Sequence, residues 1–176
     1  MSDEIQVWTI GHSTRSIEEF LEALKSQDIT ALVDVRSYPS SKRLPQFNQQ
    51  ELSSALCGAG IVYHHIRELG GRRPERKDSP NTAWKNAGFR AYADYMETED
   101  FGVGIERLLE LADGKRTAIM CAEAVWWRCH RSLISDYLKS TGVNVIHIFN
   151  ATKAEPHPYT SAARIVEGKL TYRGLF

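Results

Sequence analysis

Residues 30–35 read Thr-Ala-Leu-Val-Asp-Val, a short and almost continuously apolar run. This pattern is typical of a strand buried on both faces, as the strands of parallel sheets are. Comparable runs occupy residues 5–10, 61–66, 117–121 and 143–148. Helical patterns lie between these runs, so the sequence predicts an α/β fold with a mostly parallel sheet of about five strands. We expect helices on both faces, in a Rossmann-like three-layer arrangement.

Five segments carry apolar residues at helical spacing. The first begins at Ser16, where Glu19 completes a capping box three residues later. A second opens at Asn48, and its Cys57 is expected to be a small buried apolar residue. The remaining helices are expected at about 89–97, 101–112 and 130–140. In the C-terminal tail, Leu170 and Tyr172 alternate as a short edge strand would.

Length and composition fit one domain of ordinary size over residues 1–176. The formal net charge is zero, so an argument for nucleic-acid binding must come from local patches. No apolar run is long enough to cross a membrane, and the N-terminus lacks the features of a signal peptide. The chain has three cysteines, which do not suggest a disulfide framework. We therefore expect a cytoplasmic protein with free thiols and no membrane partner.

A long polar loop is expected at about 67–88, since this stretch contains Gly70, Gly71, Pro74 and Pro80. Loops of this length in a domain are usually functional or mobile, and we expect this one to be exposed and to move on ligand binding. Between residues 67 and 90, seven Lys and Arg side chains stand against three Asp and Glu, an excess of four positive charges. Such a patch favours contacts with phosphate, although solvated loops often have the same composition.

Polar side chains follow or end several of the predicted strands. His12 and Ser13 follow the first strand, Arg36 follows the second, Tyr63 lies in the third, and Cys121 ends the fourth. Ligands of open parallel sheets bind beyond the carboxyl ends of the strands. We therefore expect these groups to gather at one edge of the sheet. The alternatives are capping of the first helix for His12 and Ser13, and an ion pair with a neighbouring carboxylate for Arg36.

Residues 121–131 form the densest group of reactive side chains, Cys-Ala-Glu-Ala-Val-Trp-Trp-Arg-Cys-His-Arg. A thiol ends a strand, a carboxylate follows, and Cys129, His130 and Arg131 stand where a helix begins. The N-terminus of a helix offers unpaired N–H groups and partial positive charge. It therefore lowers the pKa of a cysteine and attracts anionic groups.

We expect Glu123 to be the central catalytic residue, with Cys121 and His12 as further catalytic residues. Partial burial would raise the pKa of Glu123, while a neighbouring arginine would lower it. The structural alternative is a salt bridge from Glu123 to Arg36 or Arg131. The side chains expected to bind the substrate are Ser13, Arg36, Tyr63, Trp126, Trp127, Cys129, His130 and Arg131. The two tryptophans would stack on a flat ring or, alternatively, cover the top of the core.

Two other chemistries remain open for the same segment. Cys121, Cys129 and a histidine could hold zinc, but their spacing is not that of a usual zinc knuckle. Cys121 and Cys129 could also form a redox pair, although the gap is far longer than Cys-x-x-Cys. His147, in the last predicted strand, is expected to be a satisfied core histidine. We expect no cofactor and assign no metal ligand.

Five motifs, taken in this order, resemble the family known as domain of unknown function 488. The resemblance runs from about residue 6 to 149 and implies a one-domain cytosolic α/β protein of bacteria or archaea whose motifs form one site. It supplies no reaction. The motifs are Thr9-Ile10-Gly11-His12-Ser13, Asp34-Val35-Arg36 with Pro39 and Ser40, Leu69-Gly70-Gly71, Cys121-x-Glu123-x5-Cys129-His130-Arg131 and Val145-Ile146-His147-Ile148.

These observations predict an enzyme that acts on an anionic small molecule or on nucleic acid. A nucleotide, nucleoside or nucleic-acid base is the expected substrate, because the local basic clusters follow strand ends. Hydrolysis, cleavage of a glycosidic bond and group transfer are the reaction classes that such a site would serve. The alternative is a non-catalytic binding or regulatory module with a cysteine-based metal or redox site.

Overall fold

The computed structural model describes residues 4–174, and its centre is a six-stranded sheet in the order β3-β2-β4-β1-β5-β6. The first five strands run parallel, and β6 returns antiparallel along β5. The prediction of a mostly parallel α/β sheet is confirmed. The strands are β1 (Gln6–Gly11), β2 (Ala31–Asp34), β3 (Val62–His65), β4 (Thr117–Cys121), β5 (Asn144–Asn150) and β6 (Lys153–Pro156).

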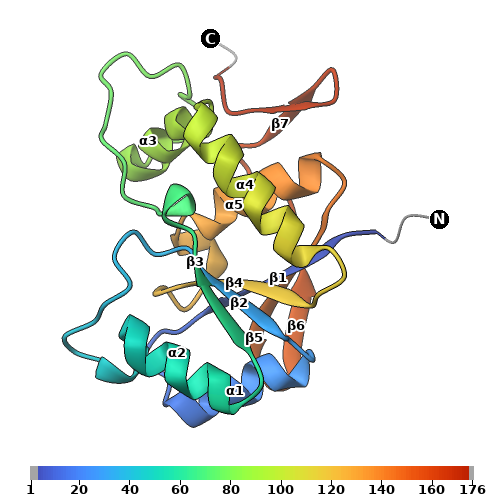
Figure 1. Cartoon of the computed structure of the whole chain (residues 1–176). Helices are drawn as coiled ribbons and strands as arrows, with labels where there is room; N and C mark the ends of the chain where they lie inside the picture. The colour runs from blue at the N-terminus through green and yellow to red at the C-terminus, as the bar shows by residue number, and fades with distance from the viewer. Residues whose placement is uncertain (1–3, 175–176) are drawn as a thin grey trace.

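Five helices cover the two faces of this sheet, as Figure 1 shows. One pair lies below the sheet in that view, and the other three helices lie above it. The Ser16–Glu19 capping box is present and begins the first helix. The first pair is α1 (Ile17–Ser26) and α2 (Gln49–Gly58); the other three are α3 (Ala87–Tyr95), α4 (Glu99–Ala112) and α5 (Arg131–Ser140).

The two faces of the sheet have separate cores because alternate strand residues point in opposite directions. Trp8 and Ile10 of β1 pack in the core beneath α1 and α2. Val7 and Ile119 pack in the core beneath α4 and α5, and Cys121 belongs to this second core. The thiol that ends β4 is therefore on the same side of the sheet as α5.

The short strand expected around Leu170 is present as β8 (Lys169–Thr171), which pairs with β7 (Arg164–Val166) in a separate two-stranded sheet. The expectation that Cys57 is buried is wrong. Cys57 is exposed, because the buried face of α2 is formed by Leu52 and Leu56.

The polar stretch that follows β3 is tied to the fold at both ends. It opens with a short 3-10 helix (Arg67–Leu69), whose Leu69 is fully buried. Residues 74–78 are exposed, and Asn81 is buried again beside α3. Within residues 4–174, no helix has both the length and the apolar character needed to cross a membrane.

Candidate functional site

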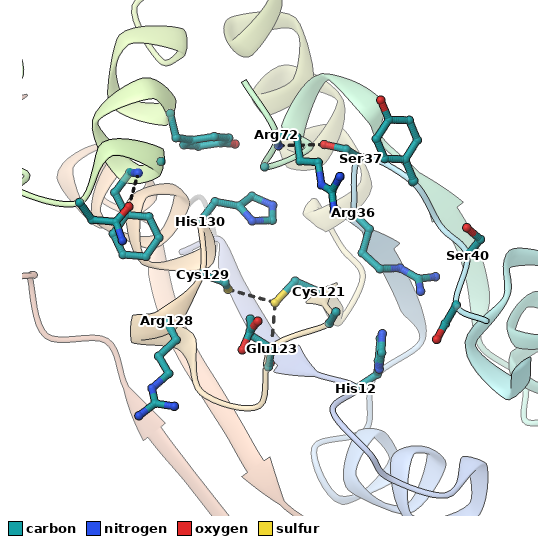
Figure 2. Close-up of a pocket in the computed structure, with 18 residues that line it drawn as sticks. His12, Arg36, Ser37, Ser40, Arg72, Cys121, Glu123, Arg128, Cys129 and His130 are labelled. Carbon is teal, nitrogen blue, oxygen red and sulfur yellow. Dashed lines mark hydrogen bonds between the residues drawn. The ribbon is translucent and has the colours of Figure 1, made fainter. Parts of the chain in front are cut away.

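A cavity of about 630 Å³ opens at the carboxyl edge of the sheet (Figure 2). It is bounded by the segments that follow β1, β2 and β4, by the start of α5, and by the polar stretch after β3. Six residues singled out from the sequence line it: His12, Arg36, Cys121, Glu123, Cys129 and His130. The structure thus brings these six together, while Ser13, Tyr63, Trp126, Trp127 and Arg131 lie outside the lining.

Cys121 and Cys129 face each other at the centre of the site, with their Sγ atoms 3.0 Å apart (Figure 2). The Nε of Arg131 donates to both sulfurs, at 3.0 Å to Cys121 and 3.2 Å to Cys129. The backbone N–H of Arg131 also donates to the sulfur of Cys129 at 3.3 Å. Two thiols and one cation are therefore in direct contact, and both sulfurs border the cavity.

This arrangement separates the acidities of the two thiols. Burial raises the pKa of Cys129, but the hydrogen bond from Cys121 and the charge of Arg131 outweigh burial, so this pKa lies well below its ordinary value. Burial and the neighbouring Cys129 raise the pKa of Cys121 far above its ordinary value. Since the two groups titrate as a pair, one proton is held on Cys121 and the thiolate resides on Cys129.

The local fold explains why the two cysteines meet. Cys121 is the last residue of β4, and Cys129 lies two residues before α5 begins at Arg131. A short 3-10 turn (Trp126–Arg128) returns the intervening loop toward the sheet. The thiolate therefore lies near the N-terminus of α5, where backbone N–H groups favour negative charge.

Arg131 has a different position from the one expected of a substrate-binding residue. It is only 1% exposed and lies beneath the cavity. Each nitrogen of its guanidinium has a partner in the protein: Nε donates to the two sulfurs, Nη1 to the hydroxyl of Thr9 at 3.2 Å and Nη2 to the backbone carbonyl of Glu123 at 2.8 Å. Arg131 thus stabilises the thiolate rather than presenting free donors to the cavity.

The expectation that Glu123 is partly shielded from water is wrong. The residue lines the cavity but is exposed. Its link to Arg131 runs through the backbone carbonyl, and Arg36 pairs with Asp34 instead. The structural salt bridge considered for the carboxylate is therefore not formed.

Two histidines border the cavity in defined tautomers. The Nε2 of His130 lies 2.7 Å from the carbonyl of Val35, and the Nδ1 of His12 lies 2.9 Å from the carbonyl of Ser13. A carbonyl only accepts, so these ring nitrogens carry the protons and Nδ1 of His130 and Nε2 of His12 do not. Burial lowers the pKa of both rings. Each is thus a neutral base at the edge of the site.

Arg36 is held rigidly by the strand that precedes it. Its Nε and Nη2 bond the two carboxylate oxygens of Asp34, with Nη2 to Oδ2 at 2.7 Å. Tyr63 donates its hydroxyl to the same carboxylate at 2.6 Å. Tyr63 therefore supports Asp34 and does not reach the cavity. The Nη1 of Arg36 is buried and has no hydrogen-bond partner in the described part of the chain.

The remaining expected binding residues have structural positions. Ser13 adopts a positive φ of 47° and donates its backbone N–H to Ala122, joining the β1 and β4 loops. Trp126 stacks on His147 with the ring planes 6° apart, and Trp127 is 50% exposed. Trp126 therefore has the second role considered for these rings, which is to cover the core.

Gly71 allows the polar stretch to pass close over His130. A Cβ on residue 71 would lie 2.5 Å from the Nδ1 of that ring. Gly70 is similarly confined, because a Cβ there would lie 2.6 Å from the hydroxyl of Ser37. The paired glycines of this motif therefore serve close approach of the loop to the site.

Sequence reasoning missed several residues of the cavity wall. Arg72 and Arg128 border it as exposed cations, and the rings of Tyr38 and Phe89 also line it. Arg72 and Phe89 belong to the basic stretch and the helical segment that were noticed, but nothing in their spacing indicates that they face Cys129. Arg72 lies over the ring of Tyr38, 5.8 Å from its centroid.

The donor set does not form a ready metal centre. Among residues 4–174, no group of three or more His, Cys, Asp and Glu side chains is placed to hold a metal ion. The two sulfurs are already bridged by the Arg131 cation, and His130 directs Nε2 to a backbone carbonyl.

Fold and site together define a three-layer α/β protein with a thiol pair at the carboxyl edge of its sheet. The chain belongs to the family of the domain of unknown function DUF488, whose model matches residues 16–138 of the 176. It matches no curated protein and no solved structure with significance. The matched range contains Arg36 and residues 121–131, whereas the motifs at 9–13 and 145–148 lie outside it.

Proposed function

We propose that the chain is an enzyme that binds an anionic substrate in this cavity and attacks it with the thiolate of Cys129. The observation that carries the proposal is the thiol pair with Sγ atoms 3.0 Å apart and both sulfurs bonded by Arg131. A thiolate is the nucleophilic form of cysteine, and a buried guanidinium keeps that form available near neutral pH.

The neighbouring groups supply what a two-step displacement needs. The sulfur of Cys129 would form a bond to an electrophilic carbon or phosphorus atom, and the leaving group would depart with its electron pair and take the proton of Cys121. A water molecule would then displace the sulfur after giving a proton to His130 or His12, which both line the cavity, and this proton would return to Cys121. Transfer to an acceptor other than water would follow the same steps.

The charge of the wall favours an anion. Arg36, Arg72 and Arg128 line the cavity, and Glu123 is the carboxylate on the same wall. The charge of Arg36 is matched by Asp34, but its Nη1 is buried without a partner and would gain an acceptor from a bound anion. Arginine donors suit the oxygens of phosphate and carboxylate groups.

A flat ring in the substrate is favoured by the aromatic side chains of the wall. Tyr38, which is 64% exposed, and the half-buried Phe89 both line the cavity. Exposed aromatic rings stack on nucleobases with little dependence on sequence. A nucleotide or a related phosphorylated compound combines both features, and it is the substrate class we propose.

Binding and reactivity of matched variants test the proposal. Nucleoside monophosphates, the parent nucleosides and inorganic phosphate are titrated into the protein by calorimetry. We expect the monophosphates to bind, and Arg72→Ala to weaken them by about tenfold or less, as loss of one exposed charge contact would. Any turnover found with the panel should be abolished in Cys129→Ser and retained in Cys57→Ser. The proposal would be contradicted by turnover that persists in Cys129→Ser, or by nucleosides that bind as tightly as their monophosphates.

A second candidate function is favoured by the short distance between the two sulfurs. Thiols this close can form a disulfide when an oxidant removes two electrons and two protons. The pair would then act in redox chemistry, with Cys129 attacking the oxidant and Cys121 resolving the product. This candidate predicts that the dithiol and disulfide forms interconvert, whereas the hydrolytic proposal needs only the dithiol.

A further inference from the structure

Thr9 and His147 take no part in the proposed reaction, yet both connect to its central cation. The hydroxyl of Thr9 accepts from Nη1 of Arg131 at 3.2 Å. The same hydroxyl lies 2.5 Å from Nδ1 of His147. The register of the sheet places Thr9 directly beside His147 on the adjacent strand, so both side chains point toward α5.

The hydrogen bonds continue beyond His147. Its Nε2 lies 2.8 Å from Nδ1 of His157, and the Nε2 of His157 lies 2.8 Å from a carboxylate oxygen of Asp136. Asp136 also accepts from the hydroxyls of Tyr172 at 2.7 Å and Thr160 at 2.5 Å. The network leaves α5 at Arg131, crosses β1 and β5, and returns to α5 at Asp136.

When the His157 ring is neutral, the two end groups fix the direction of every proton in this hydrogen-bond network. The carboxylate of Asp136 accepts, so Nε2 of His157 carries the proton and its Nδ1 accepts from His147. His147 is then protonated at Nε2, and its Nδ1 accepts the hydroxyl proton of Thr9. The Thr9 oxygen is thereby left with its lone pairs for Arg131. Each member depends on the next for its orientation.

The hydrogen-bond network is shielded from solvent, so water does not compete for its hydrogen bonds. Thr9, Asp136, His147 and His157 are each at most 3% exposed. Trp126 covers His147 with ring centroids 4.6 Å apart. Burial lowers the pKa of His147 to about 2, and the positive charge of Arg131 acts in the same direction, so this ring stays neutral.

We propose that Thr9, His147, His157 and Asp136 are positioning residues that hold the Arg131 guanidinium against the two sulfurs. Without the Thr9 acceptor, Nη1 of Arg131 would lose its partner and the group could rotate away from the thiolate. The inference rests on the proposed role of the Cys129 thiolate. It goes beyond that role because these four residues, which do not line the cavity, would control how readily the Cys129 thiolate forms.

Other groups also act on Cys129, and the test leaves them unchanged. They are Cys121 on β4, His130 and Arg131 at the start of α5, and Tyr92 on α3. A change in the acidity of the thiol pair in a Thr9 or His157 variant would therefore arise through Arg131.

The test measures how alkylation of Cys129 by iodoacetamide depends on pH, with the modified peptide quantified by mass spectrometry. In Thr9→Val we expect the midpoint to rise by about 0.5–1 pH unit, as weaker stabilisation of the thiolate requires. Thr9→Ser should restore the wild-type midpoint. Thr117→Val removes another fully buried threonine hydroxyl from the opposite end of the sheet and should leave the midpoint unchanged.

A double-mutant cycle separates a connected chain from a local effect. His157→Gln should raise the midpoint in the wild-type background and have no further effect in Thr9→Val. The proposal is refuted if Thr9→Val folds with an unchanged alkylation midpoint, or if the effects of Thr9→Val and His157→Gln on that midpoint add. If the wild-type protein itself shows an ordinary cysteine midpoint, the proposed function fails instead, so the two failures are distinguishable.

Discussion

The backbone carbonyl of Glu123 packs directly on Gly11, in the space that a Cβ on residue 11 would occupy. The same carbonyl accepts from Nη2 of Arg131 at 2.8 Å. The end of β1 and the loop after β4 are therefore in contact at the point where the central guanidinium is anchored. Absence of a side chain at Gly11 is a requirement of the site.

Replacement of this glycine should damage both stability and the thiol pair. Gly11→Ala displaces the loop that carries Glu123, and we expect the free energy of unfolding to fall by about 1–3 kcal/mol, the usual range for overpacking in a packed region. The alkylation midpoint of Cys129 should rise as Arg131 loses an acceptor. Gly102→Ala is the control, because a Cβ there meets open space within α4; it should be neutral or stabilise by up to about 1 kcal/mol.

Oxidation should join the two cysteines of the site and leave the third alone. Diamide accepts two electrons and two protons from a thiol pair, and at 3.0 Å the sulfurs of Cys121 and Cys129 are the closest candidates. Peptide mapping under non-reducing conditions should find this one intramolecular bond, with the exposed Cys57 still free within each monomer. Recovery of both site thiols after prolonged exposure would rule out the redox candidate.

The buried His147 predicts a loss of stability in acid. Its pKa is about 2 in the folded protein and 6.5 in the unfolded chain, so unfolding takes up one proton between these values. The stability that the neutral His147 gives to the folded protein is fully present above pH 6.5. As the pH falls below that value, the free energy of unfolding decreases by about 1.4 kcal/mol per pH unit. Urea unfolding of His147→Gln between pH 6 and 4 should show a slope smaller by that amount, whereas Thr117→Val should keep the wild-type slope.

The carboxylate of Glu123 should be dispensable for the thiol pair. Only its backbone carbonyl contacts Arg131, so Glu123→Gln should leave the melting temperature and the alkylation midpoint unchanged. Because the substitution removes a negative charge from an exposed part of the wall, anionic ligands should bind about two- to threefold more tightly. A raised alkylation midpoint in this variant would mean that the side chain, and not the backbone, positions Arg131.

Much of the fold is predictable because its signals are local. The apolar run at residues 30–35 and the capping box at Ser16 each identify an element without knowledge of the rest of the chain. The strand β6 is not predicted from the sequence, because Lys153–Pro156 has no apolar pattern and this strand forms by pairing along β5. The free edge of a sheet tolerates such a sequence, including its proline.

The site is predictable as a set of loops but not as an arrangement of atoms. Strand polarity correctly brings His12, Arg36 and Cys121 to one edge. The direction of each side chain is set by pairing between distant segments, and the sequence does not contain that register. The contact between Thr9 and His147 spans 138 positions, and the burial of Arg131 depends on it.

The central claim is tested most directly by the pH dependence of Cys129 alkylation in the wild-type protein, with Cys57 in the same sample as the internal reference. The account predicts that Cys129 reacts as a thiolate at pH 7 and that its reactivity falls only in acid, since Arg131 and the Cys121 thiol lower its pKa. A Cys129 that gains reactivity only in alkaline solution would contradict the account.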